Sequence, residues 1–181
     1  LPDKGWSGHV SENPQNQTDI PVLIGAGQLT DRRAPEEVAT PIELMAEALR
    51  KAAEDAGPGQ SLLQAADVLL AMGLTADSPE AQGLPSFVNV PALVAAALNI
   101  SPASQLYTAT GGNTPQMMVN RYAQQIVEGQ CELVLLTGAE ALAGMMGRLK
   151  AGLDIDGWQS QEGEPPEMVT TERLPATPHE A

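Results

Sequence analysis

Four short apolar runs alternate with segments of helical periodicity through the middle of this chain. The runs cover residues 20–28, 66–74, 104–110 and 131–142. Short runs that are apolar throughout are typical of strands buried on both faces of a parallel sheet. Helices between such strands cover the two faces. The alternation therefore predicts an α/β domain over residues 20–152, with β-α-β-α-β-α-β order and a mixed, mainly parallel sheet covered by helices on both faces.

The helix expected after the first run has the most complete set of local signals. Thr40 is a good N-cap, Glu43 completes a capping box, Pro41 suits the first helical position, and Gly57 ends the apolar stripe. Similar reasoning predicts further helices over residues 91–100 after a cap at Asn89, over 114–128, and over 142–150.

The two ends of the chain differ in composition from its middle. Residues 1–19 are polar and lack periodicity, so we expect a flexible arm there. Residues 153–181 are acidic and Pro-rich, which predicts a long loop or extended segment that leads toward a second half not included in these 181 residues.

Charge and hydropathy exclude several classes of function. The net charge of −14 argues against a nucleic-acid binder and against a polybasic membrane surface. No run reaches the length of a transmembrane helix, and the first residues lack the apolar core of a signal peptide. A cytoplasmic location is the resulting expectation.

Cysteine and histidine are too scarce for several common kinds of site. Cys131 is the single cysteine, and His9 and His179 lie in the polar terminal segments. We therefore expect no internal disulfide, no metal site and no Ser-His-Asp triad. Cys131 follows the end of an expected helix, which is the wrong end of the helix dipole for a reactive thiolate, so we interpret it as a small core residue.

The stretch TATGGNTPQMM, which begins at Thr108, is the main candidate for a site. An apolar strand runs into Gly111 and Gly112, and a helix is expected to begin near Asn113 and Thr114. The exposed amides and positive dipole of a helix N-terminus favour an anion or oxyanion, and the glycines permit close backbone approach. The alternative is that Asn113 and Thr114 only cap a helix after a turn.

Two other motifs allow a functional or a structural interpretation. Glu140 follows the last apolar run, at the sheet edge where ligands of α/β proteins tend to bind, but it could equally bond the amides of the following turn. The glycines after the first run resemble the start of a dinucleotide fingerprint. Because the next helix begins a dozen polar residues later, we favour a strand end that turns into a surface loop.

Taken together, these motifs resemble the N-terminal half of thiolase-superfamily proteins, above all the bacterial thiolase-like group labelled acetyl-CoA acetyltransferase. The resemblance covers residues 20–152 and rests on the element order together with TGGNTPQ and GAEAL. It implies an enzyme that forms or cleaves carbon–carbon bonds on acyl-CoA through an acyl-cysteine. The family's nucleophile lies at the N-terminus of the third helix, and a second half supplies a histidine and another cysteine.

The chain departs from this pattern at the nucleophile. Aligning on ATG places Thr108 there, whereas counting back from the helix end and GAE places Gly112 there, and neither is a cysteine. The resemblance thus implies a thiolase-like acyltransferase of non-standard mechanism, inactive as these 181 residues alone. The alternative is a non-catalytic thiolase-like subunit that binds acyl-CoA or a partner protein.

The resemblance also implies ligands and partners. Acyl-CoA or CoA would be a substrate rather than a tightly bound cofactor, and Gly111, Asn113, Thr114 and Glu140 would contribute to its site. Thiolases pair through their third strand, which corresponds here to the stretch from Gln105 to Thr110. A homodimer through that strand, or a heteromeric partner, is the expectation, while acyl-chain length and reaction direction are left open.

Overall fold

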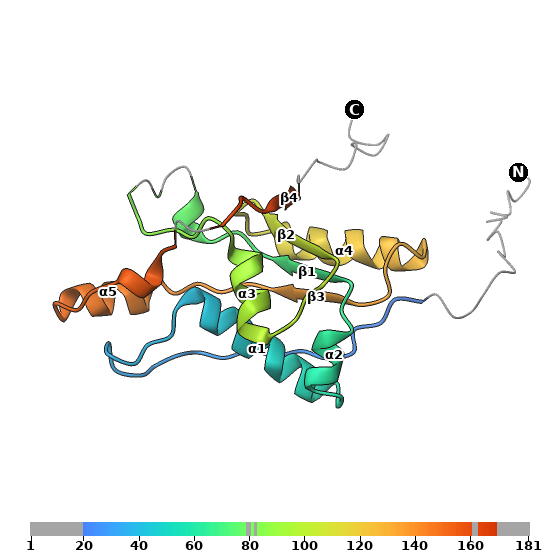
Figure 1. Cartoon of the computed structure of the whole chain (residues 1–181), viewed down its shortest axis with the longest axis horizontal. Coiled ribbons are helices and arrows are strands. Elements are labelled where there is room, and N and C mark those ends of the chain that lie inside the picture. Colours follow the sequence, from blue (N-terminus) through green and yellow to red (C-terminus); the bar gives the residue numbers. More distant parts are fainter. Residues whose placement is uncertain (1–19, 79–80, 82, 161–162, 170–181) are drawn as a thin grey trace, which may run out of the picture.

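A computed structural model of the chain describes residues 20–169, except 79–80, 82 and 161–162 (Figure 1). Helices and strands alternate along most of this length, from α1 to β4. The flexible arm expected over residues 1–19, both histidines, and the last twelve residues of the expected acidic segment lie outside the described residues.

Four parallel strands form one sheet in the order β3-β1-β2-β4. Their bounds are Val68–Ala71 for β1, Ser104–Thr108 for β2, Val134–Thr137 for β3 and Glu167–Val169 for β4. The α/β class with a sheet between helices is confirmed, and all of the described strands are parallel. The expectation did not include β4, which comes from the acidic segment and pairs with β2.

Successive residues of the central strand face opposite layers of the fold. Leu69 and Ala71 belong to the core cluster on the side of α1 and α3, whereas Val68 and Leu70 belong to the cluster on the side of α4. All four residues of β1 are buried. This explains why the strand is apolar throughout instead of alternating with polar residues.

Two capped helices, α1 (Pro41–Asp55) and α3 (Val90–Leu98), cover the first face. The amide of Glu43 donates to the Thr40 hydroxyl, and the Thr40 amide donates to the Glu43 carboxylate at 2.8 Å, so the predicted capping box is confirmed. The Asn89 side chain likewise accepts from the Ala92 amide at 3.0 Å, as its predicted role requires. A short helix that was not expected, α2 (Gln60–Gln64), follows α1.

On the second face of the sheet lies α4 (Thr114–Val127), which begins at the predicted residue. Its buried side chains Met118 and Tyr122 contact the sheet, and a positive φ of 68° at Gly129 follows its end. A fifth helix, α5 (Leu142–Lys150), extends beyond the end of the sheet where β3 ends. It packs through Met145 against Trp158.

The strand predicted over residues 20–28 is wrong. The segment forms no strand, and its apolar side chains are largely exposed, with Leu23 at 88%. Its glycines instead bring the chain against α1, because a Cβ at Gly27 would lie 2.2 Å from the carbonyl oxygen of Ala48. The amide of Ala26 also donates to the Asp55 carboxylate at 2.9 Å. The dinucleotide-type turn is absent too, since the next helix begins only at Pro41.

Candidate functional site

Because the strands are parallel, the loops after β1, β2 and β3 meet at one edge of the sheet, called here the carboxyl edge. Glycines let these loops approach closely. A Cβ at Gly73, after β1, would lie 2.5 Å from the carbonyl oxygen of Thr108 at the end of β2. A Cβ at Gly138, after β3, would lie 2.9 Å from the Cβ of Met72. The candidate residues after β2 and β3 therefore belong to one packed region.

Thr108 occupies the last position of β2, not the first turn of α4. Its side chain is only 1% exposed. Its hydroxyl accepts a hydrogen bond from the Gly73 amide at 3.0 Å and donates toward the sulfur of Met72 at 3.9 Å. This hydroxyl ties the ends of two strands together, so in this conformation it is not free to attack a substrate.

The turn from Gly111 to Thr114 lies at the start of α4 and is open to solvent at its first three residues. The Thr114 amide donates to the Gly111 carbonyl at 3.2 Å, which closes the turn. Asn113 holds the N-cap position, but its side chain makes no capping hydrogen bond. A Cβ at Gly112 would meet nothing within 4 Å. The two alignments to the thiolase family place the nucleophile position at Thr108 or at Gly112. Of these two residues, Gly112 lies next to the N-terminus of α4.

Glu140 bonds the backbone that begins α5. Its carboxylate accepts from the amides of Ala141 at 2.8 Å and Leu142 at 3.1 Å. The sequence left open whether Glu140 binds a ligand or bonds the amides of the following turn, and these hydrogen bonds are those of the second alternative. Glu140 also lines a hollow of about 20 Å³ with Leu74 and Trp158, which is room for about one water molecule and not for an acyl group.

A tyrosine and an aspartate that the sequence did not single out complete the carboxyl edge. The buried Tyr107 hydroxyl donates to the Asp77 carboxylate and accepts from the Leu74 amide at 2.8 Å. Burial raises the pKa of Tyr107 far above its usual value, and the hydrogen bond to Asp77 acts in the same direction. The two residues are 30 positions apart, so no local pattern could have indicated the pair.

Replacing Tyr107 with phenylalanine is expected to lower the free energy of unfolding by about 2 kcal/mol, because it leaves the buried Leu74 amide without its acceptor. Tyr122→Phe is the matched control, since its side chain is equally buried but its hydroxyl has no assigned bond among the described residues; we expect a change below about 0.5 kcal/mol. Urea unfolding followed by circular dichroism measures both. Equal losses in the two variants would show that the Tyr107 bonds contribute nothing specific.

The raised pKa of Tyr107 also sets the sign of a pH dependence. Above pH about 10 an unfolded tyrosine releases its proton, while folded Tyr107 still keeps its own. The unfolded state then binds fewer protons, so stability is expected to fall as pH rises through that value. Urea unfolding across this range should show a smaller fall for Tyr107→Phe than for the unaltered chain.

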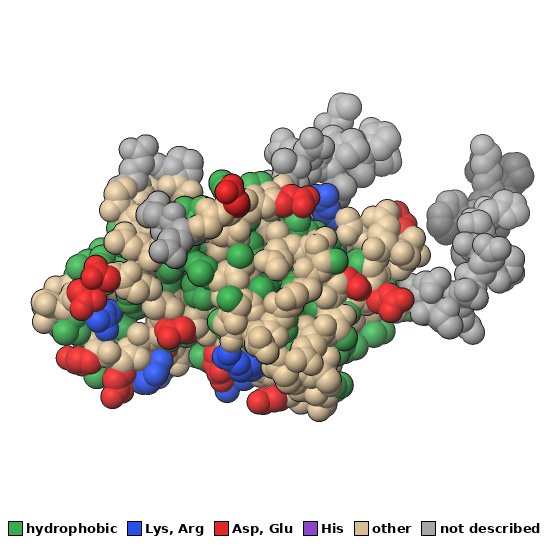
Figure 2. Space-filling view, viewed as in Figure 1, with side chains coloured by type: hydrophobic (Ala, Val, Ile, Leu, Met, Phe, Trp, Pro, Cys, Tyr) green, Lys and Arg blue, Asp and Glu red, His purple; other side chains and the backbone are tan. Residues whose placement is uncertain are grey.

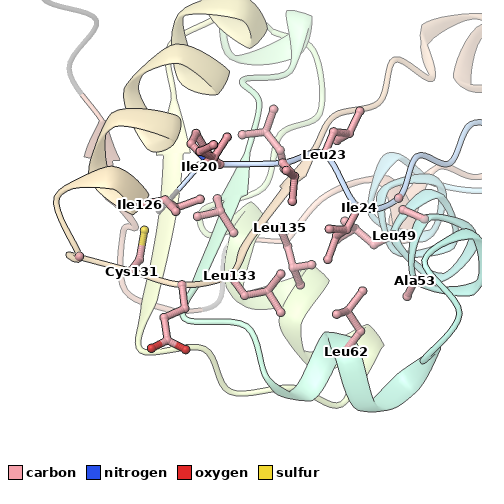
Figure 3. A pocket seen from close by; sticks show the side chains of 18 residues that line it. Ile20, Leu23, Ile24, Leu49, Ala53, Leu62, Ile126, Cys131, Leu133 and Leu135 are labelled. Carbon is pink, nitrogen blue, oxygen red and sulfur yellow. The ribbon is translucent and has the colours of Figure 1, made fainter. Parts of the chain in front are cut away.

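A larger hollow than the one beside Glu140 lies away from the carboxyl edge. It has a volume of about 590 Å³ and lies between the exposed segment from Ile20 to Gly25 and the start of β3, with Leu49 of α1 and Ile126 of α4 on its sides (Figure 3). Cys131 and Glu132 are the titratable side chains in this lining. With mainly aliphatic walls, the groove lacks the groups that acyl transfer needs.

Cys131 is a buried core residue, as predicted. It lies just before β3, at the end of the sheet opposite the carboxyl edge. Burial raises the pKa of its thiol, and the charge of Asp67 adds to this effect. A thiol in such surroundings is a poor nucleophile at neutral pH.

Charge around the molecule is mostly negative. Figure 2 shows acidic side chains along the border of one face, with the few Lys and Arg side chains placed beside them. Among the residues that the structure describes, no group of three or more His, Cys, Asp and Glu could hold a metal ion. Nor does any helix in that part of the chain combine the length and apolar character that crossing a membrane requires.

No protein-family model and no curated protein matches this chain. A solved structure does: a monomeric SCP2-thiolase-like protein type 1 from Mycobacterium smegmatis, with a TM-score of 0.51 and 24% sequence identity. The match covers 66% of this chain and 23% of that protein. The chain has a thiolase-like fold. It spans less than a quarter of the length of the matched protein.

Proposed function

We propose that this chain is the thioester-binding part of a thiolase-like acyl-CoA protein, and that its own residues bind an acyl-CoA without forming an acyl-enzyme. The observation that carries the proposal is the N-terminus of α4, which opens at the carboxyl edge through the exposed turn Gly111–Gly112–Asn113. The amides of such a turn and the positive end of the helix dipole stabilise a polarised thioester oxygen or an enolate.

Binding is favoured over covalent chemistry because the available nucleophiles are in the wrong places. The thiol of Cys131 lies at the opposite end of the sheet, and the hydroxyl of Thr108 is buried and bonded to the Gly73 amide. The turn also carries backbone amides and the Asn113 carboxamide, which hold charge but do not attack a carbonyl, and the side chain of Thr114 is buried. This arrangement agrees with the non-catalytic alternative of the thiolase resemblance.

An acyltransferase of non-standard mechanism is the second candidate. It is favoured by the same helix N-terminus, because an oxyanion site is half of what a thioester reaction needs. In that case the attacking group would come from outside these residues, in a cytoplasmic protein whose second half supplies it. We expect the chain alone to leave acetoacetyl-CoA uncleaved in the presence of free CoA.

Acyl-CoA is the first binding partner that we propose for this chain, and a protein is the second. A homodimer through Gln105 to Thr110 would need the outer edge of β2, where β4 is bound. The matched Mycobacterium smegmatis protein is described as monomeric. We therefore propose that the chain binds its ligand as a monomer.

Binding of acetyl-CoA, measured by isothermal titration calorimetry, tests this proposal. Gly112→Asp has room for its side chain and places a carboxylate at the N-terminus of α4, where it competes with the ligand's negative charge. We expect affinity to fall about tenfold while the helix keeps or gains stability.

Asn120→Asp is the control, because it adds the same charge to the exposed side of the same helix, away from its N-terminus. Its affinity should stay within about twofold of the unaltered chain. If both variants bound acetyl-CoA equally weakly, the loss of affinity would be general charge repulsion and not an effect of the α4 N-terminus. Absence of any acetyl-CoA binding by the unaltered chain would overturn the proposal.

A further inference from the structure

β3 lies at one edge of the sheet, and its outer side faces the aliphatic groove of Figure 3. The order β3-β1-β2-β4 gives it β1 as its single neighbour among the described strands. The groove is lined on one side by the successive residues from Cys131 to Leu136, so it follows the backbone edge of β3. Its opposite side is the exposed segment from Ile20 to Gly25.

Alternate residues of β3 turn their backbone groups toward this groove. The carbonyls of Leu133 and Thr137 accept at 3.3 Å and 2.8 Å from amides of β1 and of the residue after it, so these two residues face β1. Because backbone groups alternate in direction along a strand, Val134 and Leu136 present their N–H and C=O on the outer side. Unpaired groups of this kind are a template for an added strand.

The walls of the groove provide apolar contacts for side chains on both faces of an added strand. Ile126 of α4 lies on the face that Val134 and Leu136 share. Leu49 and Leu62 lie on the opposite face. Successive side chains of a strand point to opposite faces, so a peptide paired with β3 would contact the two walls in turn. Its backbone would supply affinity, and the walls would select aliphatic residues.

The charge where β3 begins is negative. Glu132 is the charged side chain in the groove lining and lies just before β3. The Asp67 carboxylate lies beside it, since it accepts from the Leu133 amide at 2.9 Å and from the Glu132 amide at 2.7 Å. These bonds lower the pKa of Asp67, so it stays ionised at neutral pH. A basic residue at this end of an occupant is therefore favoured, and an acidic one is disfavoured.

We propose that the outer edge of β3 binds an extended aliphatic peptide of a partner protein, which joins the sheet as a further strand and carries basic residues at its amino end. A parallel addition continues the direction of the other strands and places the first residues of the peptide beside Glu132. The turn at the start of α4 does not line this groove, so the inference does not depend on acyl-CoA binding.

Fluorescence anisotropy with short labelled peptides tests the site. The probe is the acetylated peptide Lys-Lys-Val-Ile-Val-Leu with a dye at its carboxyl end. A glutamate peptide, Glu-Glu-Val-Ile-Val-Leu, reverses its charge. A proline peptide, Lys-Lys-Val-Pro-Val-Leu, keeps the charge but lacks a backbone donor and fits a strand poorly. We expect both control peptides to bind at least about tenfold more weakly than the probe.

Val134→Pro removes one outward donor of β3 and leaves the bonds to β1 in place. Proline is tolerated at the first residue of an edge strand when its nitrogen faces outward. We expect the probe to bind about tenfold more weakly. Val134→Ala is the matched control, because it shortens the same side chain but keeps the N–H, and its affinity should stay within about threefold. Circular dichroism checks that both variants are folded.

Glu132→Lys reverses the charge at the start of the groove. We expect it to weaken binding of the probe about fivefold and to strengthen binding of the glutamate peptide. Glu36→Lys is the matched control, since it makes the same change at an exposed residue outside the groove lining, in the loop held by Arg148 of α5. Both affinities should stay within about twofold there. This pair decides the matter even if Val134→Pro fails to fold.

Hydrogen exchange gives a second measurement. The amides of Val134 and Leu136 should exchange fast in the free chain and become protected when the probe is bound. Protection of both amides in the free chain would overturn the proposal, because residues 20–24 or a second copy would already occupy the edge. Absence of probe binding would also overturn it. So would equal binding of the proline peptide, which would make the groove a site for any aliphatic cation, or equal effects of Glu132→Lys and Glu36→Lys.

Discussion

Gly73→Ala is expected to lower the free energy of unfolding by about 3 kcal/mol, although it adds a single methyl group. The added Cβ would lie 2.5 Å from the carbonyl oxygen of Thr108 and 2.7 Å from the amide nitrogen of Thr110. Both are backbone atoms, one in the last residue of β2 and one two residues beyond it, so they cannot turn aside as a flexible side chain would. The ends of β1 and β2 must separate, which also strains the bond from the Gly73 amide to the Thr108 hydroxyl.

Gly112→Ala is the matched control for this substitution. Its Cβ would meet nothing within 4 Å, and the residue lies at the same edge of the sheet. We expect its unfolding free energy to be unchanged or raised by up to about 1 kcal/mol, because alanine restricts the unfolded chain more than glycine does. Urea denaturation measures both, and similar midpoints for the two variants would contradict the close approach of β1 to β2.

Leu70→Ala is expected to cost about 3 to 4 kcal/mol of unfolding free energy. Leu70 lies in the central strand, is 0% exposed, and packs among Leu106, Met118 and Tyr122 on the α4 side. Strands on both sides and α4 above keep the cavity from collapsing, so most of the lost packing is not recovered.

Leu149→Ala on α5 provides the comparison. Its side chain is 45% exposed, and we expect a loss below about 1 kcal/mol. Thermal and urea unfolding of the two leucine variants should therefore differ clearly. A loss for Leu70→Ala as small as that for Leu149→Ala would mean that the α4 face is loosely packed.

Local chemistry made several parts of the fold predictable from sequence. The capping box at Thr40, the cap at Asn89 and the start of α4 at Thr114 depend on residues close to one another in the chain. The buried strand β1 was predictable because it is apolar throughout. Such signals determine helix ends and strand positions without any knowledge of the tertiary structure.

Features that depend on distant parts of the chain were missed. β4 has three residues in an acidic, Pro-rich segment, and only its register with β2 makes it a strand. Residues 20–24 are apolar like a strand, but the glycines that follow them fit against the backbone of α1. At the site, the sequence left Thr108 and Gly112 as equal candidates, and only the position of the α4 N-terminus distinguishes them.

The order in which the strands pair has a consequence for synthesis on the ribosome. β1, the central strand, finds its first partner in β2 and its second in β3, both of which come later in the chain, and β4 comes last of all. Each pairing joins distant segments, so the sheet grows outward from its centre as the chain emerges. We expect the β2 edge to stay open until residue 169 has emerged, so the sheet is completed only late in translation.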